Sequence, residues 1–431
     1  MSISIPSLRV EVNYYTIKVR GCYYINCMYN EKRLSALHVR DFRLFWFGQV
    51  ISLSGTWMQS VAQSWLVYSL TKSPLYLGII ASVASLPILF LTLFGGMVAD
   101  RYPKRNILIL TQTLSVIPAL LLGILTDTKI VTVTHVGFLA AFLGVVNAFD
   151  VPARQAFLAE VVDKSAITNA IGLNSAAFNG ARIIGPVIAG IVISSLGIPV
   201  CFYLNAASFI AVIFALYRIE ARGTLKVQSG NFIEEITGGW RFVAGEKQVL
   251  HIMILISIFS LFGIPYMTLM PVLAGEILNV GARGMSFLIA SAGVGSFIAA
   301  IMIAWKGKII KEHLFIPLSA LIFSAAIFTL SFSKSFYVSM LFVFIAGWGI
   351  VSYLATCNSH IQNRVPDALR GRVMGLYTLV FLGFAPLGNS FIGFAAETAG
   401  TIVTLKFFSL ICIIGSIIFW GQFKEQGRDS D

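Results

Sequence analysis

Residues 95–106 read Gly95-Gly96-Met97-Val98-Ala99-Asp100-Arg101-Tyr102-Pro103-Lys104-Arg105-Asn106, a short charged segment between two long apolar runs. The run before it covers residues 75–99, and the run after it covers residues 107–125. Several charges close together are costly to place in hydrocarbon, so we expect the chain to leave the membrane here and re-enter it. The alternative is a basic loop that only sets the orientation of the protein.

Apolar runs of membrane-spanning length recur along the whole chain. Its 431 residues are 57% hydrophobic and only 12% charged, whereas soluble domains carry about 25% charged residues. A spanning helix needs about 20 apolar residues, and about twelve such runs occur. They cover residues 42–70, 75–99, 107–125, 131–149, 167–196, 200–219, 249–273, 284–305, 314–332, 336–357, 373–395 and 401–420. The composition predicts an all-α polytopic membrane protein with twelve transmembrane helices.

The basic residues are distributed unevenly between the two sides of these runs. The net charge is +12, but the loops after odd-numbered runs hold few basic residues, namely Lys72, Lys129, Arg283 and Lys334. The other loops and both tails hold most of the rest. This positive-inside pattern places both termini in the cytoplasm and assigns the basic residues to anionic lipid rather than nucleic acid.

No pattern of an enzyme or an ATP-driven pump is found. The sequence lacks Gly-x-x-x-x-Gly-Lys-[Ser/Thr], which would cradle a nucleotide phosphate. Its five cysteines (Cys22, Cys27, Cys201, Cys357 and Cys412) have no paired spacing, and its five His residues are scattered. We therefore expect no cofactor, no metal and no enzymatic activity.

The chain divides into five segments. We expect an N-terminal cytoplasmic tail (1–40), a six-helix half (41–219), a cytoplasmic linker (220–248), a second six-helix half (249–422) and a C-terminal tail (423–431). Residues 1–27 lack the apolar core of a secretory signal, and Met28 resembles a conventional start, so 1–27 are expected to be non-native; a short cytoplasmic extension is the alternative. The linker is expected to form a surface helix or a plain connection.

A weak internal repeat supports two halves. Glu160-Val161-Val162-Asp163, leading to Ile171-Gly172-Leu173, is echoed by Arg364-Val365-Pro366-Asp367, leading to Met374-Gly375-Leu376. The two copies are about half a chain apart, each between the fourth and fifth run of its half. Two parallel repeats of six helices predict this arrangement.

Several separated motifs resemble the major facilitator superfamily of secondary transporters. The opening segment fits Gly-x-x-x-Asp-Arg-x-x-[Lys/Arg]-[Lys/Arg], the form of the family's loop between the second and third helices, with Pro103 where a Gly is usual. Further agreement lies in residues 42–74, 150–157, 174–186 and 365–375. Together these motifs resemble the branch that contains enterobactin-exporter-like proteins and drug:proton antiporters.

The resemblance implies a gate on the cytoplasmic side. Its candidate residues are Gly96, Asp100, Arg101, Lys104, Arg105, Asp150, Arg154, Arg370 and Arg372. Asp100 would meet the amides that begin the eleventh helix, while Arg101, Lys104 or Arg105 would reach Asp150. Asp150 and Arg154 are four residues apart and can instead pair with each other. A static structural clamp is the alternative to a gate.

Arg182 lies well inside the fifth apolar run, and an intramembrane Arg is by default a functional-site hypothesis. Its partners could be Asn174, Asn179, helix carbonyls freed near Pro186 or an anionic substrate; alternatively, it snorkels to the outer surface. Gly185, Pro186 and Gly190 resemble the antiporter helix-kink motif, although its final Gly-Gly is Ala189-Gly190 here.

Polar and aromatic residues at membrane depth are candidates for a substrate cavity. They are Trp57, Gln59, Gln63, Asn174, Asn179, Arg182, Tyr266, Trp348, Tyr377 and Asn389. Pro265 and Pro271 flank Tyr266 and predict a break in the seventh helix, where substrate sites tend to lie. Each aromatic residue has the alternative of packing in the core or against lipid.

The resemblance implies a monomeric exporter of a siderophore or lipophilic drug, driven by protons, in the cell inner (plasma) membrane. Asp150, Glu276 and Glu397 are the candidate proton carriers, with Asp150 first. The alternatives are a proton-coupled nutrient importer and a membrane sensor with the same fold but no flux.

Overall fold

The described chain is helical throughout. The computed structural model describes residues 36–220, 232–306 and 312–428, and these ranges contain helices and turns but no strand. In chain order the elements are η2 (Ala36–His38), α3 (Arg40–Thr71), α4 (Pro74–Arg101), α5 (Lys104–Asp127), α6 (Val133–Glu160), η3 (Lys164–Ala166), α7 (Ile167–Leu196), α8 (Ile198–Arg218), α9 (Phe232–Gly245), α10 (Lys247–Ile258), η4 (Phe259–Gly263), η5 (Ile264–Leu269), α11 (Met270–Val272), η6 (Leu273–Ile277), α12 (Gly281–Lys306), α13 (Glu312–Leu330), α14 (Phe336–Arg364), α15 (Asp367–Ala399) and α16 (Thr401–Arg428). The expectation for residues 1–27 lies outside the described ranges.

Ten helical segments of the described chain are long and apolar enough to cross a membrane. Two of the twelve predicted runs, in α3 and α13, are not long and apolar enough to be counted among these ten. Helix α3 carries Gln49, Ser52 and Gln59, which lower its apolar content but are buried in the protein. In α13 the apolar part, Leu314–Leu330, is shorter than the other spans. Length and composition therefore account for ten spans, and the roles of α3 and α13 rest on their packing.

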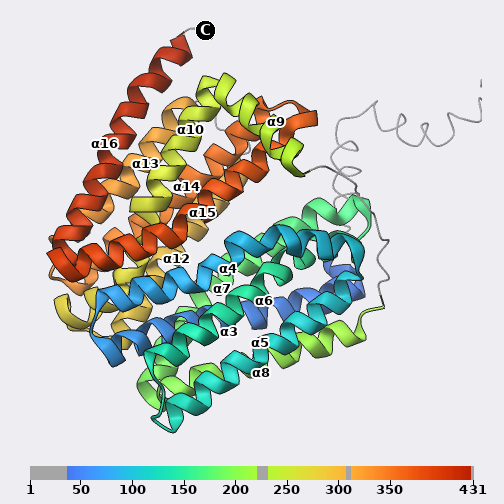
Figure 1. The fold of residues 1–431 in the computed structure, drawn as a ribbon, viewed down its shortest axis with the longest axis vertical. Helices are drawn as coiled ribbons and strands as arrows, with labels where there is room; N and C mark the ends of the chain where they lie inside the picture. Colours follow the sequence, from blue (N-terminus) through green and yellow to red (C-terminus); the bar gives the residue numbers. More distant parts are fainter. Residues whose placement is uncertain (1–35, 221–231, 307–311, 429–431) are drawn as a thin grey trace, which may run out of the picture.

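The helices form two groups (Figure 1). Helices α3 to α8 lie together in the lower part of the view, and α9, α10 and α13 to α16 lie together in the upper part. Helix α9 occupies part of the predicted linker, and its Gly239 lies against the backbone of Arg372 in α15. We call these the N-terminal and C-terminal groups, with α12 and the broken segment 259–277 belonging to the second.

The two groups touch most closely near the loop that contains Ser73. There Ser82 of α4 donates to the carbonyl of Pro386 in α15 at 2.5 Å and accepts from Ser390 at 2.8 Å. A Cβ on Gly78 would lie only 2.4 Å from the carbonyl oxygen of Asn389. We call this side of the helices the Ser73 end and the opposite side, which carries the opening segment, the Asp100 end.

The seventh apolar run is broken, as its prolines predict. Helix α10 ends at Ile258 and is followed by the π-helix η4, the 3-10 helix η5, one turn of α11 and the π-helix η6. Pro265 and Pro271 each remove a backbone donor, which favours the departure from regular α-helical hydrogen bonding in this segment. The segment stays within the packed helices, since Ser260, Tyr266 and Met270 are all buried.

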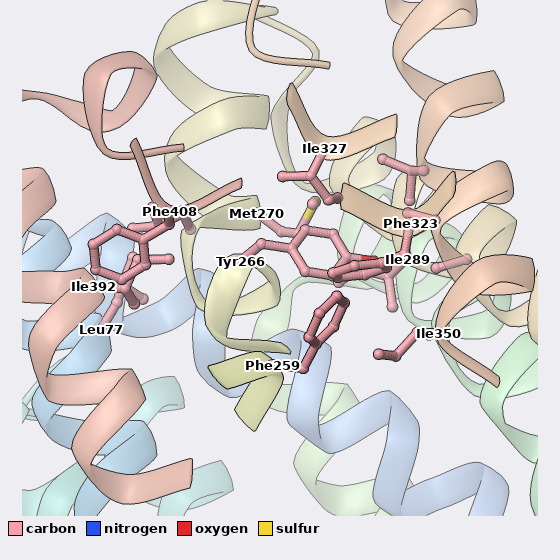
Figure 2. Packing of buried hydrophobic residues seen from close by; sticks show 14 of the residues in the cluster. Leu77, Phe259, Tyr266, Met270, Ile289, Phe323, Ile327, Ile350, Ile392 and Phe408 are labelled. Atoms are coloured by element: carbon pink, nitrogen blue, oxygen red, sulfur yellow. The ribbon is translucent and has the colours of Figure 1, made fainter. Parts of the chain in front are cut away.

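Aromatic rings fill the interior of the C-terminal group (Figure 2). The rings of Tyr266 and Phe323 lie edge to face with centroids 5.7 Å apart, and the rings of Phe259 and Tyr353 are 4.8 Å apart. Tyr266 is only 4% exposed. The broken segment therefore anchors itself in this core through its aromatic residues.

Glycines allow the closest helix contacts within each group. In the C-terminal group, a Cβ on Gly295 would lie 2.0 Å from the carbonyl oxygen of Phe344, and one on Gly347 would lie 2.0 Å from that of Ala292. In the N-terminal group, a Cβ on Gly95 would lie 2.1 Å from the carbonyl oxygen of Ala148. Small residues let membrane helices approach until their backbones touch, which replaces the missing hydrophobic driving force.

We predict that Gly347→Ala lowers the thermal unfolding midpoint of the detergent-purified protein, because the added methyl group forces α12 and α14 apart. Overpacking of this kind costs about 1–3 kcal/mol. Gly172→Ala in α7 is the matched control, since a Cβ there meets nothing within 4 Å. Both changes bring the same gain in helix propensity, so equal midpoints for the two variants would contradict the proposed contact.

Candidate functional site

A cavity of about 420 Å³ lies where the two groups meet. We call it the central cavity. Helices α3, α4 and α6 form most of its wall, and Met267, Thr268 and Ile289 of the C-terminal group complete it. Its volume is within the range of small-molecule sites. None of its lining residues in the described chain carries a charge, and serine, threonine and amide side chains supply its polar groups.

Helix α3 supplies three of the predicted cavity residues. Trp57, Gln59 and Gln63 all line the central cavity. Gln59 is held in place because its Oε1 accepts from the Nδ2 of Asn205 in α8 at 2.7 Å. Ser208 in turn donates to Asn205 at 3.0 Å. Buried amides need such partners, and the arrangement leaves Gln63 as the less constrained of the two glutamines.

Asn389 also reaches the edge of this site. Its Oδ1 accepts from the hydroxyl of Thr268 at 2.9 Å, and Thr268 lines the central cavity. The contact joins α15 to the broken segment at the depth of the cavity. A change in the position of α15 would therefore be transmitted directly to the cavity wall.

Three predicted cavity residues lie elsewhere in this structure. Tyr266 is in the aromatic core, because the 3-10 turn points its ring toward Phe323. Trp348 packs edge-on against Phe315 at 6.3 Å. Tyr377 is 8% exposed and its hydroxyl lies 3.4 Å from the carbonyl of Leu354. None of these three is among the residues that line the central cavity in this conformation, and their part in substrate binding stays a prediction.

The polar residues of α7 are divided between two environments. Asn174 lines a second cavity, described below, whereas Asn179 donates to the carbonyl of Ser175 in its own helix at 2.9 Å. The guanidinium of Arg182 lies over the ring of Trp57, with its carbon 5.7 Å from the ring centroid. Neither asparagine is hydrogen-bonded to Arg182 in the described structure.

The helix-kink motif of α7 packs against both groups. A Cβ on Gly185 would lie 2.5 Å from the Cβ of Trp57, and one on Gly190 would lie 2.8 Å from that of Ser286 in α12. Pro186 is buried within α7, which continues through it from Ile167 to Leu196. The motif therefore lets α7 approach α3 on one side and α12 on the other.

Asp150 is the centre of a buried polar network. Its Oδ1 accepts from Thr111 at 2.7 Å and from Gln112 at 2.9 Å. Its Oδ2 accepts from the Nε of Arg154 at 2.8 Å, so the pair predicted from the four-residue spacing is present despite Pro152. Arg154 also donates to the Oε1 of Gln49. The Asp150 carboxylate thus accepts four hydrogen bonds, from Thr111, from Gln112 and from both the Nε and Nη2 atoms of Arg154.

This network faces a second cavity of about 230 Å³, which we call the Asp150 cavity. Asp150, Arg154, Gln112 and Asn174 are among its lining residues. Thr56, Leu143 and Asn147 line both this cavity and the central cavity. The two spaces are therefore neighbours, separated only by side chains that they share.

The basic residues of the opening segment do not contact Asp150 in this structure. Lys104 pairs with Glu160 at 2.7 Å, in an ion pair that is mostly buried. Arg105 donates to the carbonyls of Leu216 at 2.7 Å and Tyr217 at 3.0 Å, at the end of α8. Asp100 and Arg101 are exposed. Lys104 and Arg105 thus fasten α5 to α6 and α8 within the N-terminal group.

Of the remaining gate candidates, Arg372 lines an open cleft between the two groups. A space of about 530 Å³ separates residues 88–93 of α4 from residues 371–382 of α15, and Arg372 lines it. Arg370 pairs with Asp367 in its own helix at 2.5 Å. A Cβ on Gly96 would meet nothing within 4 Å. The two groups are therefore apart at the Asp100 end.

Two carboxylates join the groups at the Ser73 end. Glu397 of α15 accepts from the Ser73 hydroxyl at 2.6 Å and from the backbone N–H of Leu75 at 3.2 Å. Glu276 accepts from the hydroxyl of Tyr68 at 3.2 Å. We call these two contacts the Ser73-end latch. The sequence drew attention to both acids near helix ends, but their partners are more than two hundred residues away and no local pattern identifies them.

Comparison with known proteins covers nearly the whole chain. A sequence model of the family described as transmembrane secretion effector matches residues 32–428. The staphyloferrin A transporter of Staphylococcus aureus (strain NCTC 8325 / PS 47) is 25% identical over 88% of this chain and 95% of its own length. The multidrug efflux pump Tap of Mycolicibacterium fortuitum is 24% identical over 89% and 96%. The enterobactin exporter EntS of Escherichia coli O1:K1 / APEC is 21% identical over 82% and 84%.

A solved structure shows the same arrangement of helices. It is a bacterial homolog of the human lysosomal transporter Spinster, in an inward-facing and unoccupied conformation. The TM-score is 0.72 at 12% identity, and the match covers 91% of this chain and 98% of that one. This likeness shows the fold alone.

We predict that Asp150→Asn lowers the thermal unfolding midpoint, because it leaves the Arg154 guanidinium buried without a counter-charge. Removing one partner of a buried ion pair costs about 3–5 kcal/mol. The double variant Asp150→Asn/Arg154→Gln should recover part of the loss. Arg370→Gln is the matched control, because its pair with Asp367 is exposed, and should change the midpoint little. Additive effects of the two buried changes would refute the coupling.

Proposed function

The chain belongs to the transmembrane secretion effector family of the major facilitator superfamily, and from this premise we propose that it exports a siderophore or a lipophilic drug across the plasma membrane. The observation that carries this proposal is the central cavity, which is neutral, amphipathic and placed between two groups of helices. The siderophore and drug transporters among its relatives support the same substrate classes.

We further propose that the chain crosses the membrane twelve times, as two halves of six helices. Helices α3 and α13 supply the two spans beyond the ten that are apolar enough. Helix α3 packs against α7 and α8, so its polar residues face protein rather than lipid. Twelve spans put both termini on one side, and the uneven Lys and Arg distribution assigns that side to the cytoplasm.

On this orientation the Ser73 end faces outward and the structure is open to the cytoplasm. The Ser73-end latch holds the outer side closed, while the cleft beside Arg372 leaves the inner side open. In the opposite state, Asp100 would contact the start of α15 near residues 371–373 and close the inner side. Alternation between these two states exposes the central cavity to each side in turn.

Protons are the proposed driving ion, with Asp150 as the group that carries or controls them. Its carboxylate faces a cavity that shares wall residues with the central cavity. Neutralisation of Asp150 would release Arg154 and Gln49, which join α6 to α3. Such a change can shift an equilibrium between two states that differ by a few kcal/mol. We propose that the protein performs this cycle as a monomer in contact with lipid.

We predict that Glu397→Ala opens the outer side more often, because α4 then loses two of its hydrogen bonds to α15. The reporter is Ser60→Cys, which adds an exposed thiol to the central cavity. Labelling of intact cells with a membrane-impermeant maleimide should be faster when Glu397→Ala is also present. Glu220→Ala, at the Asp100 end, serves as the control. Equal labelling rates in both backgrounds would contradict the latch.

The function is tested by substrate-linked proton flux in proteoliposomes that contain a pH-sensitive dye. In a screen of catecholate siderophores and lipophilic cations, wild-type protein should move protons with at least one compound, and Asp150→Asn should abolish this flux. Asp163→Asn, an exposed carboxylate on the same side, is the control and should retain it. Equal flux in wild type and Asp150→Asn would remove Asp150 from coupling. Uptake in the inward direction would indicate an importer, and binding without flux would indicate a sensor.

A further inference from the structure

Arg182 is a charged residue that lies against the wall of the central cavity. It lies near the middle of α7, and its guanidinium is over Trp57, which lines that cavity. The carbonyl oxygen of Arg182 lies 2.9 Å from the position of a Cβ on Gly293, so α12 holds this turn of α7 closely. The backbone at Arg182 is therefore fixed by contacts with both helix groups.

The guanidinium has no counter-charge in this structure. No acidic side chain of the described residues forms an ion pair with Arg182, and its Nε is buried without a hydrogen-bond partner. By contrast, Asp150 and Arg154 form an ion pair with each other on α6. A buried cation is costly unless it is paired, and the ring of Trp57 offsets only a part of that cost. The site is thus incomplete in the absence of an anion.

We propose that Arg182 binds the carboxylate of the transported molecule, so that the substrate class is an amphipathic organic anion. This inference rests on the proposed transport function and narrows its substrate. Arginine suits the role because its planar fork of N–H groups matches a carboxylate with two parallel hydrogen bonds. The neutral amides of Gln59 and Gln63, together with the apolar wall, would receive the rest of the molecule.

The single positive charge of Arg182 determines which ligand charge the site can neutralise. The lining of the central cavity contains no Lys, Arg, Asp or Glu, so Arg182 can neutralise one negative charge and leave no surplus. A phosphate dianion would keep an unpaired charge in a low-dielectric space, and a lipophilic cation would be repelled by the guanidinium. A monoanionic carboxylate is the group whose charge the site balances.

The test compares two probes that differ only in charge, 4-biphenylcarboxylate and its neutral amide, by equilibrium dialysis with the purified protein. Wild-type protein should bind the carboxylate about ten- to hundredfold more tightly than the amide, as expected for one charge-assisted contact. Arg182→Gln should lose this preference while it binds the amide as before, and Arg182→Lys should retain part of it. Equal binding of both probes to wild type, or an unchanged preference in Arg182→Gln, would overturn the proposal.

A second measurement does not depend on the folding of an Arg182 variant. Because Trp57 lies against Arg182, carboxylate binding should change the tryptophan emission of the wild-type protein, excited where the probe does not absorb, and Trp57→Phe should remove that change. An emission change that persists in Trp57→Phe would place the anion elsewhere and overturn the assignment. Flux of a neutral or cationic compound without any carboxylate preference would overturn the anion site and leave the proposed transport function in place.

Discussion

Hydrocarbon offers no hydrogen-bond partner to a peptide group, and this constraint accounts for the architecture of the chain. Every long segment within the membrane must satisfy its own backbone, so the described residues are helical. Because lipid is as apolar as a leucine side chain, the helices associate through close contact rather than through exclusion from water. The glycines at 95, 295 and 347 allow backbones to meet backbones. Where prolines interrupt a helix, the freed segment is covered by protein.

The low polarity of the interior also makes a charged side chain costly unless it has a partner. Asp150 and Arg154 are neutralised on one helix and further satisfied from α3 and α5, so they cost little in this conformation and become costly when one is altered. Arg182 differs, since the described structure gives it an aromatic face but no anion. The Asp150–Arg154 pair carries its own counter-charge, whereas Arg182 has no anionic partner among the described residues. This difference is the basis on which we propose that Asp150 controls a conformational change and that Arg182 binds a ligand.

The contacts between the two helix groups differ at the two ends of the molecule. At the Ser73 end, Glu397 and Glu276 join the groups through hydrogen bonds. At the Asp100 end, Lys104 and Arg105 form their contacts within the N-terminal group, and a cleft separates α4 from α15. The Ser73-end latch consists of hydrogen bonds from two hydroxyl groups and one backbone N–H to carboxylates, so it can form and break without disturbing the packed cores. The central cavity lies between these two ends.

The sequence by itself determined the apolar runs, the charged loop at residues 95–106 and the break of the seventh helix, and it offered the Asp150–Arg154 pair as one of the alternatives for Asp150. These features are local, because they depend on residues within a few turns of one another. The tertiary structure alone decided that Lys104 pairs with Glu160, that Ser73 meets Glu397, and that Gln59 lines the cavity while Tyr266 and Tyr377 are in the core. Helical periodicity shows which residues share a face, but not which of several apolar neighbours that face will meet. That choice is made by close packing between helices that are far apart in the chain.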